Sequence, residues 1–264
     1  MPEGDTVWAA ARRLNEALAG RSLTQSDFRV PRFATSDLTG RSVREVVSRG
    51  KHLLTRVDGE VSIHTHLKME GRWRMRPASE PTPRDHRIRL VLANEQWRAV
   101  GYQLGVVEII RTAHEDRVVG HLGPDLLGPG WDLDEAVRRL RVDPARPIGE
   151  ALLDQTRLAG IGNVYKAEVL FLLAVNPWTP VNAVPDLSAL VERARLLLDT
   201  NKDRVARTTT GAPRDGQNTW VHGRAGRPCR RCGTRIRKAE QGPATEERIT
   251  FWCPHCQPRQ SNSL

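Results

Sequence analysis

The sequence predicts an α+β protein built from a β-sandwich or barrel with one helix packed on it, a helical domain and a small cysteine-rich ribbon. Hydrophobic residues follow strand patterns through residues 42–118 and helical spacing from residue 131 onward. All four cysteines lie between Cys229 and Cys256. A chain of 264 residues has room for two domains and an appendage. We place the N-terminal domain at 1–118, a linker at 119–130, the helical domain at 131–220 and the ribbon at 221–264.

The first helix is expected directly after the N-terminus. Asp5-Thr6 is a plausible N-cap, and apolar residues recur at helical spacing from Val7 to Leu18. Gly20 then ends the helix.

Strands are predicted for most of residues 42–118, with Asp58-Gly59 and Asn94-Glu95 as turns and 77–83 as a loop. The expected strands cover 43–47, 53–54, 61–67, 87–92 and 105–110.

Glycine and proline concentrate at 119–130 and mark the boundary to the helical part. Four helices are expected there, and 207–219 is expected to be a loop. The first helix begins at Asp132 or Asp134 and ends at Leu140, and the second runs from Pro147 to Leu153. The third covers Val164–Ala174, and the fourth covers Leu187–Leu198 with Asp186 as its N-cap.

The charge balance points to a polyanionic partner. Lysine and arginine exceed aspartate and glutamate by 41 to 31, and His222–Lys238 holds seven basic residues and no acid. A basic protein without such a partner stays the alternative. No apolar run approaches the ~20 residues of a membrane span. Glu3 and Asp5 stand where a signal peptide would be basic. We therefore expect a soluble, cytoplasmic protein without a membrane partner.

The cysteines have the spacing of a structural zinc site. Cys229 and Cys232 form one pair and Cys253 and Cys256 the other, each with two intervening residues. Four thiolates leave Zn²⁺ no open position, so the metal's role would be structural. Two disulfides are the alternative. Basic residues on the same hairpin would contact nucleic-acid phosphates: Arg230, Arg231, Arg235, Arg237 and Arg248.

The N-terminus carries a candidate nucleophile. Removal of Met1 would leave Pro2 as a secondary amine, and an α-amino group titrates near pH ~8. Its addition to a sugar C1′ would give an iminium, which is a strong electron sink. Glu3 could act as the neighbouring acid/base. The alternative is a frayed, solvated terminus.

A second candidate site is the glycine-broken turn within Gln155–Tyr165. Gly160 and Gly162 let the backbone approach a ligand, and amides at the next helix start could bind phosphate together with Asn163. An ordinary connection between helices explains the same residues.

Together these features resemble the formamidopyrimidine-DNA glycosylase/endonuclease VIII family of base-excision enzymes. The resemblance spans nearly the whole chain, and the Pro-Glu-Gly-Asp start looks closer to the endonuclease VIII branch, which favours oxidised pyrimidines. It implies an N-terminal β-sandwich, a helix–two-turn–helix domain and a zinc finger. Its motifs are Pro2-Glu3, Arg49-Gly50-Lys51-His52-Leu53-Leu54, His66-Leu67-x-Met69-x-Gly71, Leu158–Tyr165 and Gly223-Arg224-Ala225-Gly226.

The resemblance assigns a role to each matching residue. Pro2 would be the nucleophile, Glu3 its acid/base, and Lys51 the hairpin lysine of β-elimination and phosphate contact. Met69 would fill the gap left by a flipped base. Asn163, with Gly162 beside it, would grip the phosphate next to the lesion. Arg248 would contact DNA phosphate and assist δ-elimination.

Two departures from the family pattern affect this picture. Gly101–Gly105 replaces the Arg-Arg-Phe wedge of the oxidised-purine enzymes, so Gln103 and Leu104 are the candidates to fill the void opposite the lesion. Thr6 follows Asp5 where the family usually has an acidic residue.

The predicted function is a bifunctional DNA glycosylase/AP lyase of base-excision repair. It would remove oxidised bases, pyrimidines above all, through a Schiff base on Pro2 followed by β,δ-elimination. Its partner would be double-stranded DNA with a damaged base or abasic site. Structural Zn²⁺ would be its cofactor, and the protein is expected to be a monomer. A non-catalytic damaged-DNA binder and an enzyme with abasic-site lyase activity alone are the alternatives.

Overall fold

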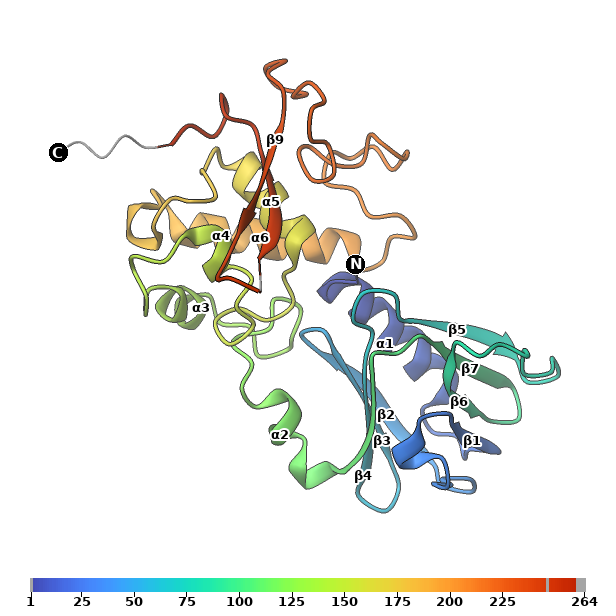
Figure 1. Ribbon diagram of the computed structural model, residues 1–264. Coiled ribbons are helices and arrows are strands. Elements are labelled where there is room, and N and C mark those ends of the chain that lie inside the picture. The colour runs from blue at the N-terminus through green and yellow to red at the C-terminus, as the bar shows by residue number, and fades with distance from the viewer. Residues whose placement is uncertain (1, 246, 260–264) are drawn as a thin grey trace. The chain divides into compact units, whose positions relative to one another are not determined.

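The computed structural model describes residues 2–245 and 247–259. The chain divides into two compact units, Met1–His121 and Leu122–Leu264. Figure 1 labels the elements of both units. The finer division at residues 130 and 220 stays a prediction.

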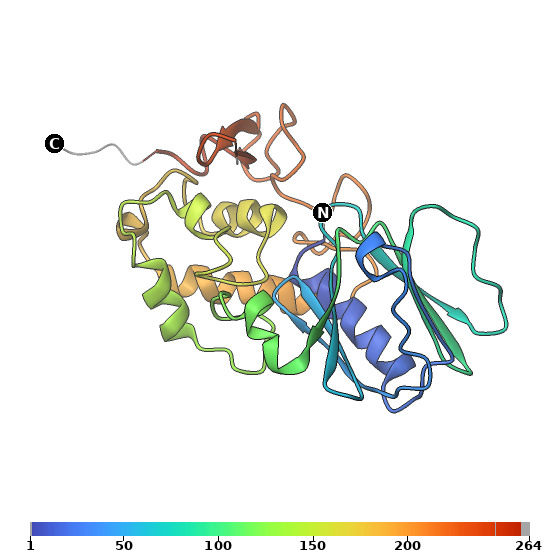
Figure 2. The ribbon, with the colours of Figure 1, turned by 60° about the horizontal axis from the view of Figure 1, so that its bottom comes forward.

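The first unit is a β-sandwich of two antiparallel four-stranded sheets, with strand orders β1-β6-β7-β5 and β2-β3-β4-β8. Helix α1 packs mainly on β2 and also contacts β3, β5 and β7 (Figures 1 and 2). The strands are β1 (Gln25–Phe28), β2 (Val43–Arg49), β3 (His52–Val57), β4 (Val61–His66), β5 (Arg72–Pro77), β6 (Ile88–Ala93), β7 (Trp97–Tyr102) and β8 (Val106–Arg111), and the helices are α1 (Gly4–Leu18), η1 (Pro31–Phe33), η2 (Thr112–His114) and α2 (Asp116–Val119).

The apolar core of this unit lies between the sheets and α1. Val7 and Leu14 of α1 are buried with Leu53 of β3 and Ile63 of β4. Strands of both sheets contribute buried apolar residues to this core, as expected for a sandwich. The predicted α+β class with a packed helix is confirmed.

Helix α1 begins earlier than predicted. Glu3 is the N-cap residue, in an extended conformation and without a side-chain capping bond, so the predicted Asp5-Thr6 cap is wrong. Asp5 instead lies buried in the first turn, where a carboxylate interacts favourably with the positive end of the helix. Gly20 follows the helix with φ of +74°, the left-handed conformation that glycine supplies at helix ends.

Three strands had no clear sequence signal: β1, β5 and β7. Strand β5 lies at a sheet edge and carries Arg72, Arg74 and Arg76 at alternate positions. Because an edge strand tolerates charge on its exposed face, its sequence lacks the apolar character that marks the central strands.

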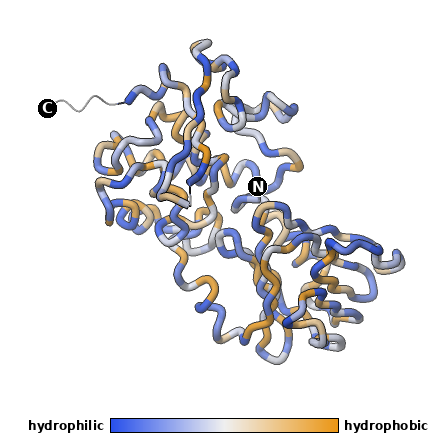
Figure 3. The backbone as a smooth tube through the Cα atoms, viewed as in Figure 1, coloured by the Kyte–Doolittle hydropathy of each residue, from blue (hydrophilic) through white to orange (hydrophobic). Residues whose placement is uncertain are grey.

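The second unit is helical, with one two-stranded sheet at its C-terminal end. Its elements are α3 (Leu133–Leu140), α4 (Ile148–Ala151), α5 (Asn163–Leu172), η3 (Val181–Ala183), α6 (Leu187–Asn201), β9 (Arg237–Gln241) and β10 (Arg248–Trp252). Figure 3 shows β9 as hydrophilic, in keeping with its Arg-Lys-Ala-Glu-Gln sequence. Helices α3, α5 and α6 surround an apolar core that includes Leu140, Leu170 and Leu190.

The helix caps follow the sequence closely. Asp132 accepts a hydrogen bond from the Glu135 amide at 3.0 Å, which decides between Asp132 and Asp134. Asp186 accepts one from the Ala189 amide at 2.8 Å. Both carboxylates satisfy amides that a helix start leaves without a partner. Helix α4 is shorter than predicted and ends at Ala151.

No helix in the described residues combines the length and the apolar character that crossing a membrane requires.

Candidate active site and DNA interface

Pro2 lies immediately before the N-cap of α1. The Glu3 carbonyl accepts the Val7 amide at 3.0 Å and closes the first helical turn. Glu3 is fully buried and Pro2 is half-buried, so the frayed, solvated terminus is wrong for these two residues. The positive end of a helix disfavours a nearby protonated amine. Met1, whose removal the Pro2 chemistry requires, lies outside the described residues.

Lys51 occupies the tip of a two-residue hairpin between β2 and β3. Arg49 pairs with His52, and Gly50 has φ of +58°, which favours glycine at the first turn position. His52, the residue after Lys51, pairs with His66 at the end of β4. The hairpin tip and the end of β4 therefore lie close together.

Met69 stands in the loop between β4 and β5 and is 59% exposed. Core packing, the ordinary role of a methionine in this position, is thereby excluded. The loop is closed by the Gly71 amide, which donates to the Leu67 carbonyl at 2.9 Å. A Cβ on Gly71 would lie 2.3 Å from that carbonyl oxygen, so only glycine fits. The role of Met69 in filling a base gap stays a prediction.

The two void-filling candidates differ in burial. Leu104 is 5% exposed and packs in the sandwich core, so that part of the prediction is wrong. Gln103 is half-buried, has φ of +47° and donates from Nε2 to the Glu70 carboxylate at 2.6 Å. Gln103 is thus tied to the loop that presents Met69.

Three histidines of β3 and β4 lie together on the sheet next to the hairpin tip, and His121 approaches them from outside the sheet, a feature that sequence reasoning missed. The His52 ring stacks on His64 at 5.1 Å and meets His66 edge-on at 4.8 Å, and His121 lies 6.2 Å away. Burial, followed by the neighbouring charges, lowers the pKa of His52 to about 3 and that of His66 to about 4. These two rings are neutral at physiological pH.

The glycine-broken turn of the second unit is fastened by one side chain. Gln155 donates from Nε2 to the carbonyls of Leu153 and Ile161, and its Oε1 accepts the Gly160 amide at 3.1 Å. Gly160 has φ of +102°, a conformation that strongly favours glycine. The turn before Asn163 is therefore a fixed structure.

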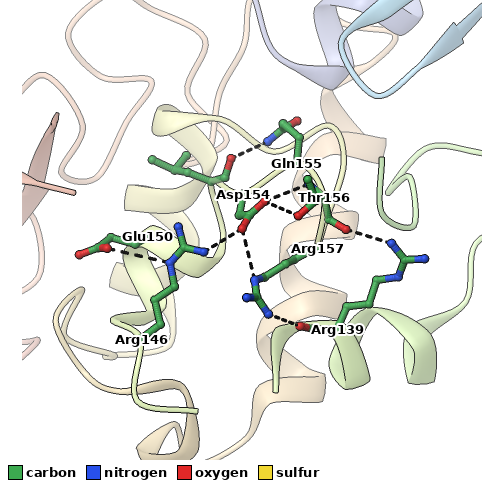
Figure 4. A network of polar contacts seen from close by, with 8 residues as sticks. Arg139, Arg146, Glu150, Asp154, Gln155, Thr156 and Arg157 are labelled. Atoms are coloured by element: carbon green, nitrogen blue, oxygen red, sulfur yellow. Dashed lines mark hydrogen bonds and ion pairs between the residues drawn. The ribbon is translucent and has the colours of Figure 1, made fainter. Parts of the chain in front are cut away.

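A network of charged side chains around Asp154 also stabilises this turn (Figure 4). Asp154 accepts from Arg146 at 2.7 Å and from Arg157 at 3.3 Å, and it also receives the amide and hydroxyl of Thr156. Arg157 in turn donates to the Arg139 carbonyl at 2.7 Å, which connects the turn to α3. These contacts hold the pKa of Asp154 below its ordinary value despite its partial burial.

Asn163 begins α5 and contacts the C-terminal hairpin. Its Nδ2 donates to the Ile249 carbonyl at 2.8 Å, and its Oδ1 is buried without a partner among the described residues. Gly162 is the N-cap of α5. Arg248, the exposed first residue of β10, directly precedes Ile249. The structure thus brings Asn163 and Arg248 together from positions far apart in the sequence.

The four cysteines fit a tetrahedral metal. Their sulfur atoms all lie within 4.8 Å of one another, with Cys229 to Cys256 at 3.9 Å and Cys232 to Cys253 at 3.5 Å. Four sulfurs around a zinc at ~2.3 Å would lie about 3.8 Å apart. All four are free thiols, so the disulfide alternative is wrong.

Gln257 anchors the second cysteine pair to the helical core. It is fully buried, accepts the Cys253 amide at 3.0 Å and donates to the Val175 carbonyl at 2.8 Å. Its own carbonyl accepts from Asn176 at 2.8 Å.

Arg230 and Arg231 point toward the protein's own backbone. Arg230 donates to the carbonyls of Thr219 and Gly216. Arg231 lies over the Phe171 ring at 4.5 Å and donates to the carbonyl of that residue at 3.5 Å. Both side chains have structural partners, and their predicted contact with DNA stays a prediction.

Sequence comparison shows the family to which the chain belongs. Residues 1–102 match the formamidopyrimidine-DNA glycosylase N-terminal domain, and residues 122–202 match the H2TH domain of the same enzymes. The chain belongs to the formamidopyrimidine-DNA glycosylase/endonuclease VIII family. It is 53% identical over 261 residues to endonuclease 8 2 of Mycobacterium tuberculosis, covering 97% of this chain and 100% of that protein.

A second relative and a solved structure agree with this assignment. The DNA-(apurinic or apyrimidinic site) lyase Nei2 of Mycolicibacterium smegmatis is 50% identical over 257 residues, covering 97% of this chain and 99% of that protein. These relatives place the chain on the endonuclease VIII side of the family. The Lactococcus lactis Fpg in complex with DNA containing an abasic site shares the fold, with a TM-score of 0.80 at 24% identity over 97% of this chain and 100% of that one.

Proposed function

We propose that this protein is a bifunctional DNA glycosylase/AP lyase that removes oxidised bases, pyrimidines above all, through a Schiff base on Pro2. The observation that carries the proposal is the placement of Pro2 directly before helix α1, beside the fully buried Glu3. Membership of the family makes the protein a DNA-repair enzyme of the glycosylase and lyase type. Its DNA substrate is double-stranded, with a damaged base or an abasic site.

The chemistry follows from a secondary amine at the helix start. The Pro2 nitrogen attacks the sugar C1′ while the bond from C1′ to the base breaks, and the amine gives up its proton. The C1′–O4′ bond of this adduct then opens, O4′ takes up a proton, and the nitrogen lone pair forms the iminium, which acidifies the C2′ hydrogen. Loss of that proton leaves its electron pair in a new C1′–C2′ double bond, which gives an enamine. The enamine then expels the 3′-phosphate as the bond from C3′ to the phosphate oxygen breaks. A second elimination expels the 5′-phosphate. Glu3 is the group next to Pro2 that can exchange a proton with the sugar or the departing base.

Side chains of each unit contact the phosphates of the DNA backbone, and one side chain fills the gap that the extruded nucleotide leaves in the base stack. In the first unit, Lys51 at its hairpin tip contacts phosphate and Met69 enters the vacated stack. In the second unit, Asn163 and Arg248 form a joint phosphate contact, supported by their shared link through Ile249. Arg248 also assists the second elimination.

A structural zinc ion completes the second unit. The sulfur distances of Cys229, Cys232, Cys253 and Cys256 fit four thiolate ligands. When bound, zinc holds the two cysteine pairs together and has no position open for substrate. It stabilises the β9–β10 hairpin, from which Arg248 projects.

Borohydride trapping tests this function directly. Reduction of the iminium should join the protein covalently to a duplex with an abasic site or thymine glycol, and Pro2→Gly should abolish the adduct. Lys51→Ala should still form the adduct but cut the strand more slowly. Intact mass should show that Met1 is absent. If the processed wild-type protein forms no adduct on either duplex, it is a damaged-DNA binder, and if it forms one on the abasic duplex alone, it is a lyase only.

A further inference from the structure

A polar side-chain array lies on the outer face of the β2-β3-β4-β8 sheet. Leu53 and Ile63 point into the sandwich core, so the alternate residues of β3 and β4 lie on the opposite face. His52 is paired with His66, and His64 is paired with Glu108 of β8. Three histidines and one carboxylate therefore share this face, next to the tip that carries Lys51.

A continuous chain of hydrogen bonds connects these groups. His64 Nδ1 lies 3.0 Å from Glu108 Oε2, and His52 Nδ1 lies 2.8 Å from His64 Nε2. An ionised carboxylate only accepts, so Nδ1 of His64 carries a hydrogen. In the neutral ring Nε2 is then an acceptor, and His52 must donate from Nδ1. The chain thus fixes His52 with its hydrogen on Nδ1 and its lone pair on Nε2.

The surroundings of His52 and His66 favour neutral rings over imidazolium ions. His66, His64, His121 and Lys68 all add positive or potentially positive charge near His52. His66 accepts the Lys68 amide on Nδ1 at 2.9 Å, which also requires that nitrogen to be unprotonated. Glu108 is the carboxylate that faces this group of rings. Its single charge orients the array through His64.

We propose that Glu108 and His64 are positioning residues that hold His52, and through it the Gly50-Lys51 hairpin tip, in the geometry needed for elimination. His52 and Lys51 are adjacent in the chain and β3 begins at His52, so no flexible residue separates the histidine from the lysine. A side chain that is fixed in tautomer and orientation therefore fixes the backbone from which Lys51 projects. This inference rests on the proposed function, in which Lys51 serves the elimination step.

The role predicts a selective defect. A misplacement of about 1 Å can lower a rate by about a hundredfold without abolishing binding. Disturbing His64 should therefore slow strand cleavage and leave Schiff-base formation at Pro2 unchanged. A side chain whose role was only to stabilise the sheet would affect both steps together or neither.

The test separates three measurements on a duplex with a preformed abasic site. Single-turnover reactions quenched with borohydride give the rate of Schiff-base formation, and unquenched reactions give the rate of strand cleavage. Binding is measured on a tetrahydrofuran duplex, which cannot form the Schiff base. The variants are His64→Leu, which removes both hydrogen bonds, and His64→Gln, which keeps an acceptor near the Nε2 position. Glu108→Leu is a second variant that removes the same orienting contact and disturbs folding less, because its side chain is partly exposed.

Ser62→Ala is the matched control. Ser62 lies on the same strand and face, is fully buried, and donates to Glu115 at 2.5 Å, so its loss also removes a buried hydrogen bond. We expect His64→Leu and Glu108→Leu to cleave about tenfold more slowly, with binding and Schiff-base formation within about twofold of wild type. His64→Gln should recover most of the cleavage rate, and Ser62→Ala should match wild type.

Other outcomes overturn the inference. Cleavage by His64→Leu at the wild-type rate, or an equal defect in Ser62→Ala, would show that the array is structural alone. Imidazole ¹⁵N spectra give an independent readout, since His52 should carry its hydrogen on Nδ1 in wild type and lose this preference in Glu108→Leu. A wild-type protein that forms no adduct would instead refute the proposed function, so the two failures are distinguishable.

Discussion

Glu168 anchors the segment that leads into the cysteine ribbon, and replacing it should cost substantial stability. This residue of α5 is fully buried. Its carboxylate accepts the backbone amides of Trp220, Val221 and His222 at 2.7, 2.9 and 2.8 Å and also the Thr209 hydroxyl. One side chain therefore accepts the hydrogen bonds of three consecutive amides that lie outside any helix or strand.

The size of the effect follows from these contacts. Glu168→Ala leaves one buried and two part-buried amides without their acceptor, and a fully buried group of this kind costs ~1–3 kcal/mol. Burial raises the pKa of Glu168, so removing this buried carboxylate returns part of the loss. We expect the free energy of unfolding to fall by about 3 kcal/mol, a large share of the ~5–15 kcal/mol of a typical domain.

Urea denaturation at neutral pH and hydrogen exchange measure this loss. Amides 220–222 should show the largest increase in exchange rate in Glu168→Ala, because they lose their own acceptor. Glu192→Ala, an exposed change on α6, is the control and should shift stability by less than about 0.5 kcal/mol. If Glu168→Ala lost under about 1 kcal/mol, or if amides 220–222 kept their protection, the anchoring argument would be refuted.

Two further predictions concern the first unit. Burial lowers the pKa of His52 and His66 from 6.5 to about 3 and about 4, so the stability from their neutral rings is present above pH 6.5 and lost as pH falls toward these values. His66→Asn keeps an acceptor for the Lys68 amide and cannot titrate, so a plot of its denaturation midpoint against pH should be shallower. An identical plot would contradict this assignment. Met69→Ala should change unfolding by less than about 0.5 kcal/mol because the side chain is exposed. It should weaken binding to a tetrahydrofuran duplex about tenfold by fluorescence anisotropy, and unchanged affinity would exclude the gap-filling role.

Local patterns in the sequence predicted much of the fold. Asp132 and Asp186 cap their helices because a short carboxylate before an apolar run satisfies nearby amides, whatever the rest of the chain does. The cysteine pairs were recognisable for the same reason, since each pair needs only two intervening residues.

Contacts between distant segments could not be predicted in this way. Asn163 bonds to Ile249, 86 residues away, and the histidine array depends on strand register across β3, β4 and β8. Arg230 and Arg231 looked like solvent-facing DNA contacts, yet their guanidinium groups bond to backbone carbonyls. Composition cannot distinguish an arginine that contacts a ligand from one that binds its own chain.

Gln257 has a consequence for metal uptake. Its bonds to Cys253, Val175 and Asn176 hold the second cysteine pair against the helical core by protein contacts alone. An isolated ribbon must order its whole chain when it captures an ion, and that ordering subtracts from its affinity. Here half of the ligand set is already in place on a folded support. Reloading after chelation should therefore need only the Cys229–Cys232 turn to close, and the ion should be retained more tightly than by the same ribbon excised from its neighbours.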